Sequence, residues 1–412
     1  MRTGVLVLVL VLAWCCVSTL PDTSATLPST PQRPASSTLL ADLVQEMALE
    51  LSSEMRDTTT VTFSPLSITS LLSVLMLGTS GISYQQIYTA LGLPPGIDEA
   101  SIHSNFKQLI DSIIQSSQGV TLNIANGIFV RKGVHVLYDF SRSVREVYAA
   151  QVRVLDFEKN SVAATNTIND WVKNKTSGMI SQLLGQPLSP QTEFVAVNTL
   201  FFNGIWEFPF IPDLTINGPF QTGSEIIQVP MMRAAMTLRY IDIPDLNAHM
   251  VELPYVGGKF SMYILMSHGP VSSNLQELEL RIRDATSLNN YIRDMVETSV
   301  SVSLPRMRLS YKLSLKEVLK ALRVSSIFDN VKADFGRLTA SEHVWVDDVI
   351  HETVVEVTEV GTKAASATSV SINRVASAVT FMVNRPAMLF IRDLPSGLPL
   401  FWCRLVKPEP LA

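Results

Sequence analysis

Hydrophobic positions along the chain follow two spacings, one typical of helices and one typical of strands. An amphipathic helix is predicted from Leu39 to about Met55. An apolar helix is predicted from Leu66 to Leu77, because Ser64-Pro65 provides a helix start and Gly78 a stop. Other segments predict helices near 82–92, 100–117 and 313–322, a helix from 166 that turns at Ser177-Gly178, and an interrupted helix over 274–296. Strands are predicted at 121–129, 194–202, 226–266, 298–311 and from 344 onward. This mixture of helices with antiparallel strands indicates an α+β fold.

The segment from Glu359 to Pro386 departs from both spacings. Small Ala, Ser and Thr residues fill its middle, and strongly β-prone residues flank it. Alternate positions from Thr362 to Ile372 are uncharged and become apolar, whereas the positions between them are polar. Long loops inside a compact chain are uncommon and usually functional or disordered, yet a disordered linker would carry more charge, Pro and Gly. On pattern alone the segment is an ordinary long strand or an Ala/Ser linker.

The first residues have the order of a secretory signal peptide, which we assign to residues 1–18. Arg2 precedes an apolar run from Gly4 to Trp14, and small residues near Ser18 offer a cleavage site. About a dozen apolar residues are too few to span a bilayer, which argues against a membrane anchor. Residues 19–37 are rich in Pro, Ser and Thr and are expected to form a flexible arm. Residues 38–412 are expected to form one domain of a secreted, extracellular protein.

Composition narrows the classes of partner. Without Arg2 the chain has 31 basic against 37 acidic residues, and its sequence contains no run of basic residues. Binding to nucleic acid is therefore disfavoured, because it requires clustered Lys and Arg. Cys15 and Cys16 lie in the predicted signal peptide, so Cys403 has no intrachain partner and is expected to be a buried, unreactive thiol. Asn174 begins the chain's N-glycosylation sequon, Asn-Lys-Thr.

Motifs for enzymatic chemistry are missing. No Gly-x-Ser-x-Gly elbow occurs, and His351-Glu352 lacks the second His of a zinc protease. The six His are scattered and Cys pairs are absent, so we expect no metal, no cofactor and no enzyme activity.

Three polar residues interrupt apolar elements. They are Ser64, at the start of the apolar helix, Asn198, within a predicted strand, and His351, within another. Buried polar groups need hydrogen-bond partners. The three residues are therefore satisfied separately or form one polar cluster beneath a sheet, and sequence order leaves both interpretations open.

From about Leu40 to Pro408 the chain resembles the serpins, the large inhibitors of serine proteases. Each matching motif is weak alone, but their order and spacing are very specific. The motifs are Phe63-Ser64-Pro65-Leu66-Ser67-Ile68, Leu77-Gly78-Thr79, Ile168-Asn169-Asp170-Trp171-Val172, Thr176-Ser177-Gly178-Met179-Ile180, Asn198-Thr199-Leu200-Phe201-Phe202-Asn203-Gly204-Ile205-Trp206, Val229-Pro230-Met231-Met232, Glu252-Leu253-Pro254-Tyr255, Leu304-Pro305-Arg306-Met307, Val349-Ile350-His351, Glu359-Val360-Gly361-Thr362, Asn384-Arg385-Pro386 and Pro399-Leu400-Phe401.

The resemblance implies a single domain with eight or nine helices around three mainly antiparallel sheets. It also implies an exposed reactive loop at about 359–383, which a protease cuts and which then inserts into the large sheet as a new strand. Such a monomeric inhibitor traps the protease as an acyl-enzyme. The resemblance further implies a polar "shutter" of Ser64, Ser67, Asn198 and His351 under that sheet, with Trp206 near the "breach" where the loop enters.

The hinge of the loop has the composition of inhibitory family members. Its residues are Glu359, Gly361, Thr362, Lys363, Ala364, Ala365, Ser366 and Ala367. Two positions depart from the usual pattern, because Lys363 replaces a Glu and Val360 replaces a residue that is commonly polar. Lys363 would face solvent after insertion, so we expect its effect to be small.

Family spacing implies the reactive bond. It follows the residue sixteen after Glu359 and eleven before Pro386, which in both cases is Val375. Cleavage at Val375-Ala376 would suit elastase-type proteases, whereas the alternative Arg374-Val375 would suit trypsin-like proteases.

Other functions within the family stay open. A non-inhibitory carrier, storage protein or chaperone is the main alternative, and inhibition of cysteine proteases is another. Heparin activation is disfavoured, because the helix expected to bind heparin, at about 100–117, has one Lys and no Arg.

Overall fold

The computed structural model describes residues 35–55, 59–115, 119–269, 275–282, 284–361 and 379–411. The predicted signal peptide and most of the predicted arm lie outside these ranges, as do Thr362 to Ala367 of the hinge and Arg374, Val375 and Ala376. The described residues form one compact unit.

Nine α-helices and three 3-10 helices occur in the described ranges. The α-helices are α1 (Ala35–Glu54), α2 (Pro65–Gly78), α3 (Gly81–Ala90), α4 (Glu99–Gln115), α5 (Tyr138–Tyr148), α6 (Phe157–Lys175), α7 (Leu275–Arg281), α8 (Ala285–Arg293) and α9 (Lys316–Ala321). The 3-10 helices are η1 (Pro212–Leu214), η2 (Pro244–Leu246) and η3 (Ser326–Phe328).

Fifteen strands of the described chain form two sheets. The six-stranded sheet has the order β15-β10-β11-β4-β2-β3, and the nine-stranded sheet has the order β1-β14-β13-β8-β7-β6-β9-β12, with β5 paired to β6. The strands are β1 (Val61–Phe63), β2 (Val120–Arg131), β3 (Gln151–Leu155), β4 (Phe194–Gly204), β5 (Ile216–Gln221), β6 (Ile226–Ile243), β7 (Ala248–Pro254), β8 (Phe260–Ser267), β9 (Val296–Pro305), β10 (Met307–Ser314), β11 (Asp348–Val357), β12 (Val379–Met382), β13 (Ala387–Asp393), β14 (Pro399–Leu405) and β15 (Glu409–Pro410).

The α+β fold is confirmed, but the described residues join two of the three expected sheets into one. The cause is the length of β6. Its middle pairs with β9, and its last residues, Tyr240 to Ile243, pair with β7. One long strand therefore connects pairings that would otherwise belong to separate sheets.

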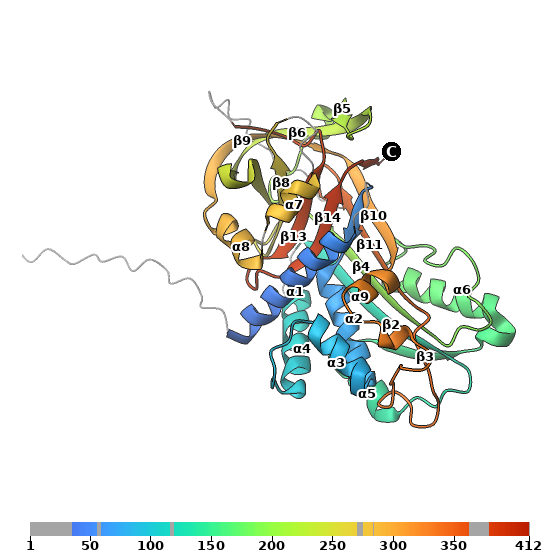
Figure 1. Ribbon diagram of the computed structural model, residues 1–412. Coiled ribbons are helices and arrows are strands. Elements are labelled where there is room, and N and C mark those ends of the chain that lie inside the picture. Colours follow the sequence, from blue (N-terminus) through green and yellow to red (C-terminus); the bar gives the residue numbers. More distant parts are fainter. Residues whose placement is uncertain are drawn as a thin grey trace, which may run out of the picture. The chain divides into compact units, whose positions relative to one another are not determined.

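Both faces of the six-stranded sheet are covered. On one face α6 packs Ile168 and Trp171 against Phe129 of β2 and Val354 of β11. On the other face lies the main core, which contains the buried helix α2. In Figure 1 α6 stands on one side of the sheet, and α1 and α2 stand on the other. Side chains between β4 and β11 are therefore buried on both faces.

Most element predictions match the structure, with shifted boundaries. Helix α2 covers the predicted 66–77 and begins after Ser64 as expected. Helix α1 begins at Ala35, within the predicted arm, instead of near Leu39. Helix α6 starts at Phe157, nine residues before its predicted start, with non-helical backbone angles at Asn160. Cys403 is buried, and burial raises the pKa of its thiol to about 12.

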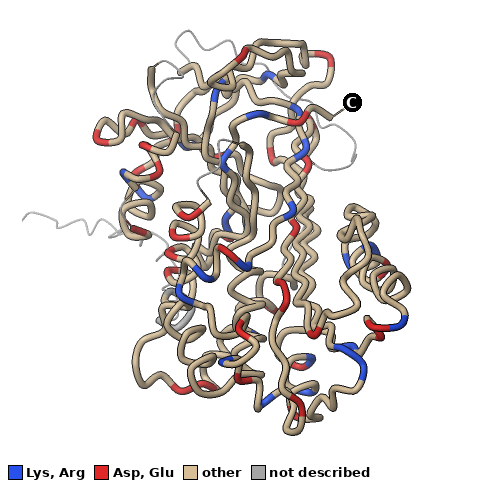
Figure 2. The backbone as a smooth tube through the Cα atoms, turned by 45° about the vertical axis from the view of Figure 1, so that its right-hand side comes forward, with Lys and Arg blue, Asp and Glu red and all other residues tan. Residues whose placement is uncertain are grey.

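No helix among the described residues is long and apolar enough to cross a membrane. Lys and Arg are interspersed with Asp and Glu along the chain (Figure 2).

Candidate functional site

The candidate site is the junction between β4 and β11, which we call the seam. The two strands run parallel, and eight residue pairs are in register, from Val195 with Asp348 to Phe202 with Val355. Their other neighbours are antiparallel, because β4 also pairs with β2 and β11 with β10. No strand of the described chain lies between them. The seam is therefore closed, and the chain leaves it at Glu359–Gly361.

A buried hydrogen-bond network lies beneath the seam, centred on Asn198 of β4. Its Nδ2 donates to the Ser67 carbonyl at 3.0 Å and to Oδ1 of Asn126 at 2.7 Å. Its Oδ1 accepts from the Ser67 hydroxyl at 2.7 Å. Asn126 in turn donates to the Ser70 hydroxyl at 3.0 Å. The network therefore joins β2 and β4 to the first turns of α2.

His351 extends this network across the seam. Its Nε2 accepts a hydrogen bond from the Ser64 backbone N–H at 3.0 Å, so the ring proton is on Nδ1. Nδ1 lies 2.5 Å from Oδ1 of Asn198, to which it donates. Complete burial lowers the pKa of His351 to about 3, because the charged ring would lose its hydration. The imidazole is thus neutral at physiological pH and acts as a fixed bridge.

Local sequence explains why α2 reaches the seam. Ser64 caps the helix by accepting from the Ser67 N–H at 3.1 Å, and Pro65 occupies the first turn. Nearly every residue of α2 is buried, so its small Ser side chains can approach the sheet closely. The cap therefore places the Ser64 N–H and the Ser67 hydroxyl at the seam.

Aromatic side chains mark the end of the seam from which the chain leaves. Trp206 stacks on Tyr255 with ring centroids 4.4 Å apart, and its indole N–H donates to the Thr358 carbonyl at 2.8 Å. This contact joins the residues that follow β4 to the residues that follow β11. Trp206 is thus separate from the Asn198 network.

Glu359 is held on two sides at this end of the seam. One carboxylate oxygen accepts from the Thr215 hydroxyl at 2.8 Å, and the other lies 3.6 Å from Nε of Arg306. The Glu359 carbonyl also accepts from the Phe210 N–H at 2.7 Å. These contacts fix the point at which the chain leaves the sheet.

Gly361 passes close to the backbone of β4. Its φ is +99°, and a Cβ at this position would lie 2.1 Å from the Gly204 carbonyl oxygen. Only glycine allows this approach.

The structure brings together four of the residues singled out in the sequence, Ser64, Ser67, Asn198 and His351, and it places Glu359 and Gly361 at the end of the seam. Sequence reasoning missed Asn126, Ser70, Thr215 and Arg306. Asn126 gave the same signal as Asn198, a polar residue inside an apolar strand. The others gave none, because Ser, Thr and Arg are ordinary surface residues.

Comparisons with known proteins agree with this architecture. Residues 41–408 match the family model described as serpin (serine protease inhibitor). A serine protease inhibitor of Rattus norvegicus is 32% identical over 85% of this chain and 84% of its own length. Serpin B11 of Homo sapiens is 31% identical over 84% of this chain and 93% of its own.

The chain belongs to the serpin family.

Solved structures share the fold of this serpin. Native protease nexin-1 with heparin superposes with a TM-score of 0.80 at 28% identity, over 90% of this chain and all of that one. Human thyroxine-binding globulin complexed with thyroxine gives a TM-score of 0.84 at 24% identity, over 91% of this chain and all of that one. A protease nexin and a thyroxine-binding globulin thus share this fold, and the fold alone does not separate their functions.

Two other predicted features of this serpin lie away from the seam. In α4, Lys107 forms an ion pair with Asp111 at 3.1 Å, so the charge of this lone basic residue is partly neutralised. Asn174 is exposed in the last turn of α6. In the part of the chain that the structure describes, no group of three His, Cys, Asp or Glu residues could hold a metal ion.

Proposed function

We propose that this serpin is a secreted suicide-substrate inhibitor of serine proteases. The observation that carries the proposal is the direct parallel pairing of β4 with β11, together with the segment that follows β11. Secretion is supported by the signal-like residues 1–18.

Strand geometry favours insertion at the seam. A strand that follows β11 after a turn at Glu359–Gly361 runs antiparallel to β11. Because β4 is parallel to β11, the same strand is antiparallel to β4 as well. Insertion thus replaces one parallel pair by two antiparallel pairs, which are slightly more stable per residue. The closed sheet is then a kinetically trapped state.

The segment from Thr362 to Val375 has the composition that insertion requires. Its fourteen residues would span about 46 Å when extended, which could carry an attached protease along the length of a domain. The face that would turn inward carries no charge from Thr362 to Ile372. A charge there would have to be buried, at a cost of several kcal/mol.

Inhibition requires that the protease cuts the loop before the loop inserts into the sheet. The protease attacks the loop and forms an acyl-enzyme, and the cut segment enters the seam with the protease still attached. Catalytic groups must keep their positions to within about 1 Å, so distortion of the tethered protease stalls deacylation.

Two bonds remain candidates for the attack, and they fit different proteases. Val375-Ala376 fits an elastase-like pocket that is small and apolar, and the spacing from Glu359 and Pro386 supports it. Arg374-Val375 fits a trypsin-like pocket that carries a carboxylate. We propose the first as the reactive bond.

The test is to mix the mature protein with an elastase and, separately, with a trypsin. We expect an SDS-resistant complex with the elastase and a released peptide whose mass begins at Ala376. A peptide that begins at Val375 would move the bond to Arg374. Complete cleavage by both enzymes, and by a panel of other serine and cysteine proteases, without any complex would refute inhibition and favour a carrier or storage role.

Two adjacent substitutions make this test specific for insertion. Thr362→Arg places a charge on the inward face and should convert the protein from an inhibitor into a substrate. Lys363→Ala changes the outward face and should leave complex formation within about twofold of wild type. Equal effects of the two variants would contradict strand insertion.

A further inference from the structure

A small cleft separates the edge strand β3 from helix α6. Its volume is about 360 Å³, at the low end of the range of about 300–1,000 Å³ for small-molecule sites. Most of its lining side chains can donate or accept hydrogen bonds. They are Gln151 and Arg153 of β3 and Thr167, Asp170, Trp171, Asn174 and Lys175 of α6.

Three donor groups in this cleft, on Arg153, Trp171 and Lys175, lack partners within the described part of the chain, whereas the Thr167 hydroxyl donates to the Ala163 carbonyl at 2.8 Å. Neither Arg153 nor Lys175 has a carboxylate within ion-pair distance there. The indole N–H of Trp171 is buried without an acceptor. The cleft therefore offers hydrogen bonds that the protein itself does not use, which indicates a polar occupant.

Asn174 is both a wall of this cleft and the acceptor residue of the sequon. Its side chain is exposed. In contrast, the sequon's Thr176 is fully buried, where its hydroxyl donates to the Val172 carbonyl at 2.9 Å and accepts from the Ile180 N–H at 3.1 Å. A glycosylating enzyme can reach this hydroxyl only before α6 packs on the sheet. Modification must therefore precede folding, and the sugar then lies at the cleft when α6 docks.

We propose that Asn174 carries an N-linked glycan whose first N-acetylglucosamine lies in the cleft and bridges α6 to β3. The sugar hydroxyls and the acetamide group can accept from Arg153 and Gln151 and donate to Asp170. This inference requires the secretion proposed above, but it does not require protease inhibition.

A glycan next to β3 would also cover an exposed edge of the six-stranded sheet. β3 is the last strand in the order of the six-stranded sheet, so one of its backbone edges has no strand partner in the described chain. Unpaired edges recruit strands from other molecules. A hydrated glycan beside β3 obstructs that approach, and it should reduce aggregation as well as stabilise the packing of α6.

The test uses the full chain secreted from mammalian cells. Mass spectrometry compares wild type with Asn174→Gln, and an endoglycosidase trims the wild-type glycan to one N-acetylglucosamine. We expect the trimmed protein to unfold about 1–3 °C above Asn174→Gln, the shift for one or two hydrogen bonds in a domain of this size. We also expect Asn174→Gln to aggregate at a lower temperature.

Cleft variants decide whether the sugar occupies the cleft. Arg153→Gln, or Gln151→Ala if the former does not fold, should abolish most of the difference between trimmed and unglycosylated protein. Lys173→Gln, on α6 outside the cleft, should preserve it. An unmodified Asn174, or a stabilisation that both cleft variants retain, would overturn the proposal. Complex formation with protease, measured on the same samples, reports separately on the proposed function.

Discussion

Nδ1 of His351 lies 2.5 Å from Oδ1 of Asn198, and the two residues face each other in register across the seam. Neighbouring strands are about 4.8 Å apart, so a strand inserted between β4 and β11 would roughly double their separation. This hydrogen bond cannot survive that change. It is therefore a direct link between a buried polar network and the closed state of the sheet.

His351→Leu should destabilise the closed fold. The substitution leaves the buried Ser64 N–H without its acceptor, at a cost of about 1–3 kcal/mol. It also removes one of the two donors to Oδ1 of Asn198, which still accepts from the Ser67 hydroxyl. Urea unfolding should report a lower midpoint, and the variant should self-associate on mild heating. Glu356→Gln is the control on the same strand, because it removes a partly exposed ion pair with Arg308 and leaves the buried network intact. An unchanged midpoint for His351→Leu would contradict the role of the network.

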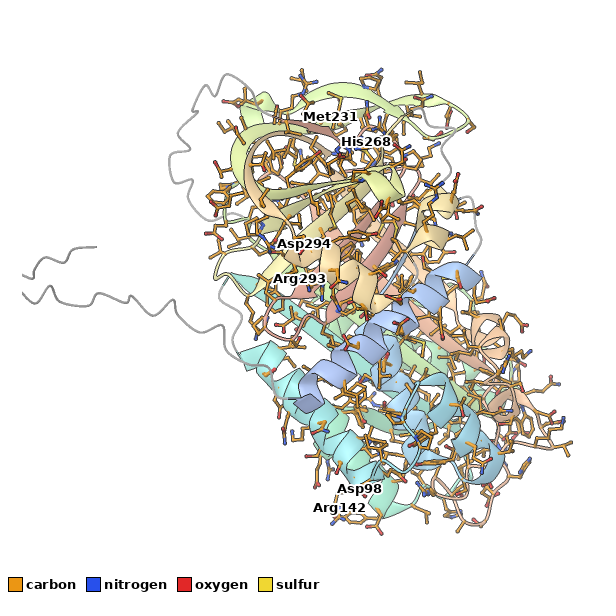
Figure 3. The ribbon with its side chains drawn as sticks, turned by 60° about the vertical axis from the view of Figure 1, so that its left-hand side comes forward. Asp98, Arg142, Met231, His268, Arg293 and Asp294 are labelled. Atoms are coloured by element: carbon orange, nitrogen blue, oxygen red, sulfur yellow. The ribbon has the colours of Figure 1, made fainter. Side chains whose placement is uncertain are left out.

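Stability should fall as the pH decreases from about 6.5 to 4, in part because of His249. This side chain is 5% exposed and lies between the rings of Phe381 and His268, the latter labelled in Figure 3. Burial, and then the nearby His268 and Arg385, lower its pKa to about 4, against the opposing effect of Asp242.

Protonation of His249 lowers the stability of the folded protein, because the folded and unfolded chains bind this proton with different pKa values. The unfolded chain binds a proton at the ordinary pKa of about 6.5, and the folded chain binds it only near 4, so protonation favours unfolding within this window. His249→Phe should make the stability curve shallower by up to about 1.4 kcal/mol per pH unit. Guanidinium unfolding at several pH values measures the slope, and parallel curves for the two proteins would exclude His249 as the cause.

Glu359→Ala should loosen the end of the seam. It removes the hydrogen bond from Thr215 and the ion pair with Arg306. A loss of about 1–2 kcal/mol would raise local opening about 5–30-fold. Hydrogen exchange of the last amides of β11 measures this opening. Thr215→Val should give part of the effect, and Glu207→Gln, a nearby exposed carboxylate, should give none.

Gly361→Ala should be more costly than the same substitution at another glycine with positive φ. Gly258, with φ of +63°, has no atom within 4 Å of an added Cβ, so its substitution costs only the backbone strain of about 1–2 kcal/mol. At Gly361 the Cβ must also displace the Gly204 carbonyl. Calorimetry on both variants compares the losses, and equal losses would mean that the close approach is not required for stability.

The sequence predicts the elements well where a local signal is strong. Ser64-Pro65 and Gly78 mark the two ends of α2, because capping and glycine termination act within a few residues. In α6 the boundary prediction is wrong, since Asn160 interrupts the helix and its first turns have no strong apolar period. Packing of Phe157 against the sheet supplies the stability that local propensity lacks.

The candidate site could be anticipated only in part. Asn198 and His351 stand out because a polar residue inside an apolar strand needs a partner. Their partners depend on which strands become neighbours, and their separation of 153 positions in the sequence leaves that choice to tertiary structure. Thr215 and Arg306 are recognisable only from their distances to Glu359.

The parallel pairing of β4 with β11 also has a consequence for how the chain folds. A hairpin between β11 and the residues after Gly361 is local, whereas β4 and β11 are far apart in the sequence, and local contacts generally form faster. During folding, the local hairpin therefore competes with the pairing of β4 and β11, and the hairpin is expected to form faster. β13 and β14, the next long strands to leave the ribosome, pair with each other and with β8 and β1 of the other sheet. If these strands dock first, they hold the end of the segment away from β11, which favours formation of the closed sheet.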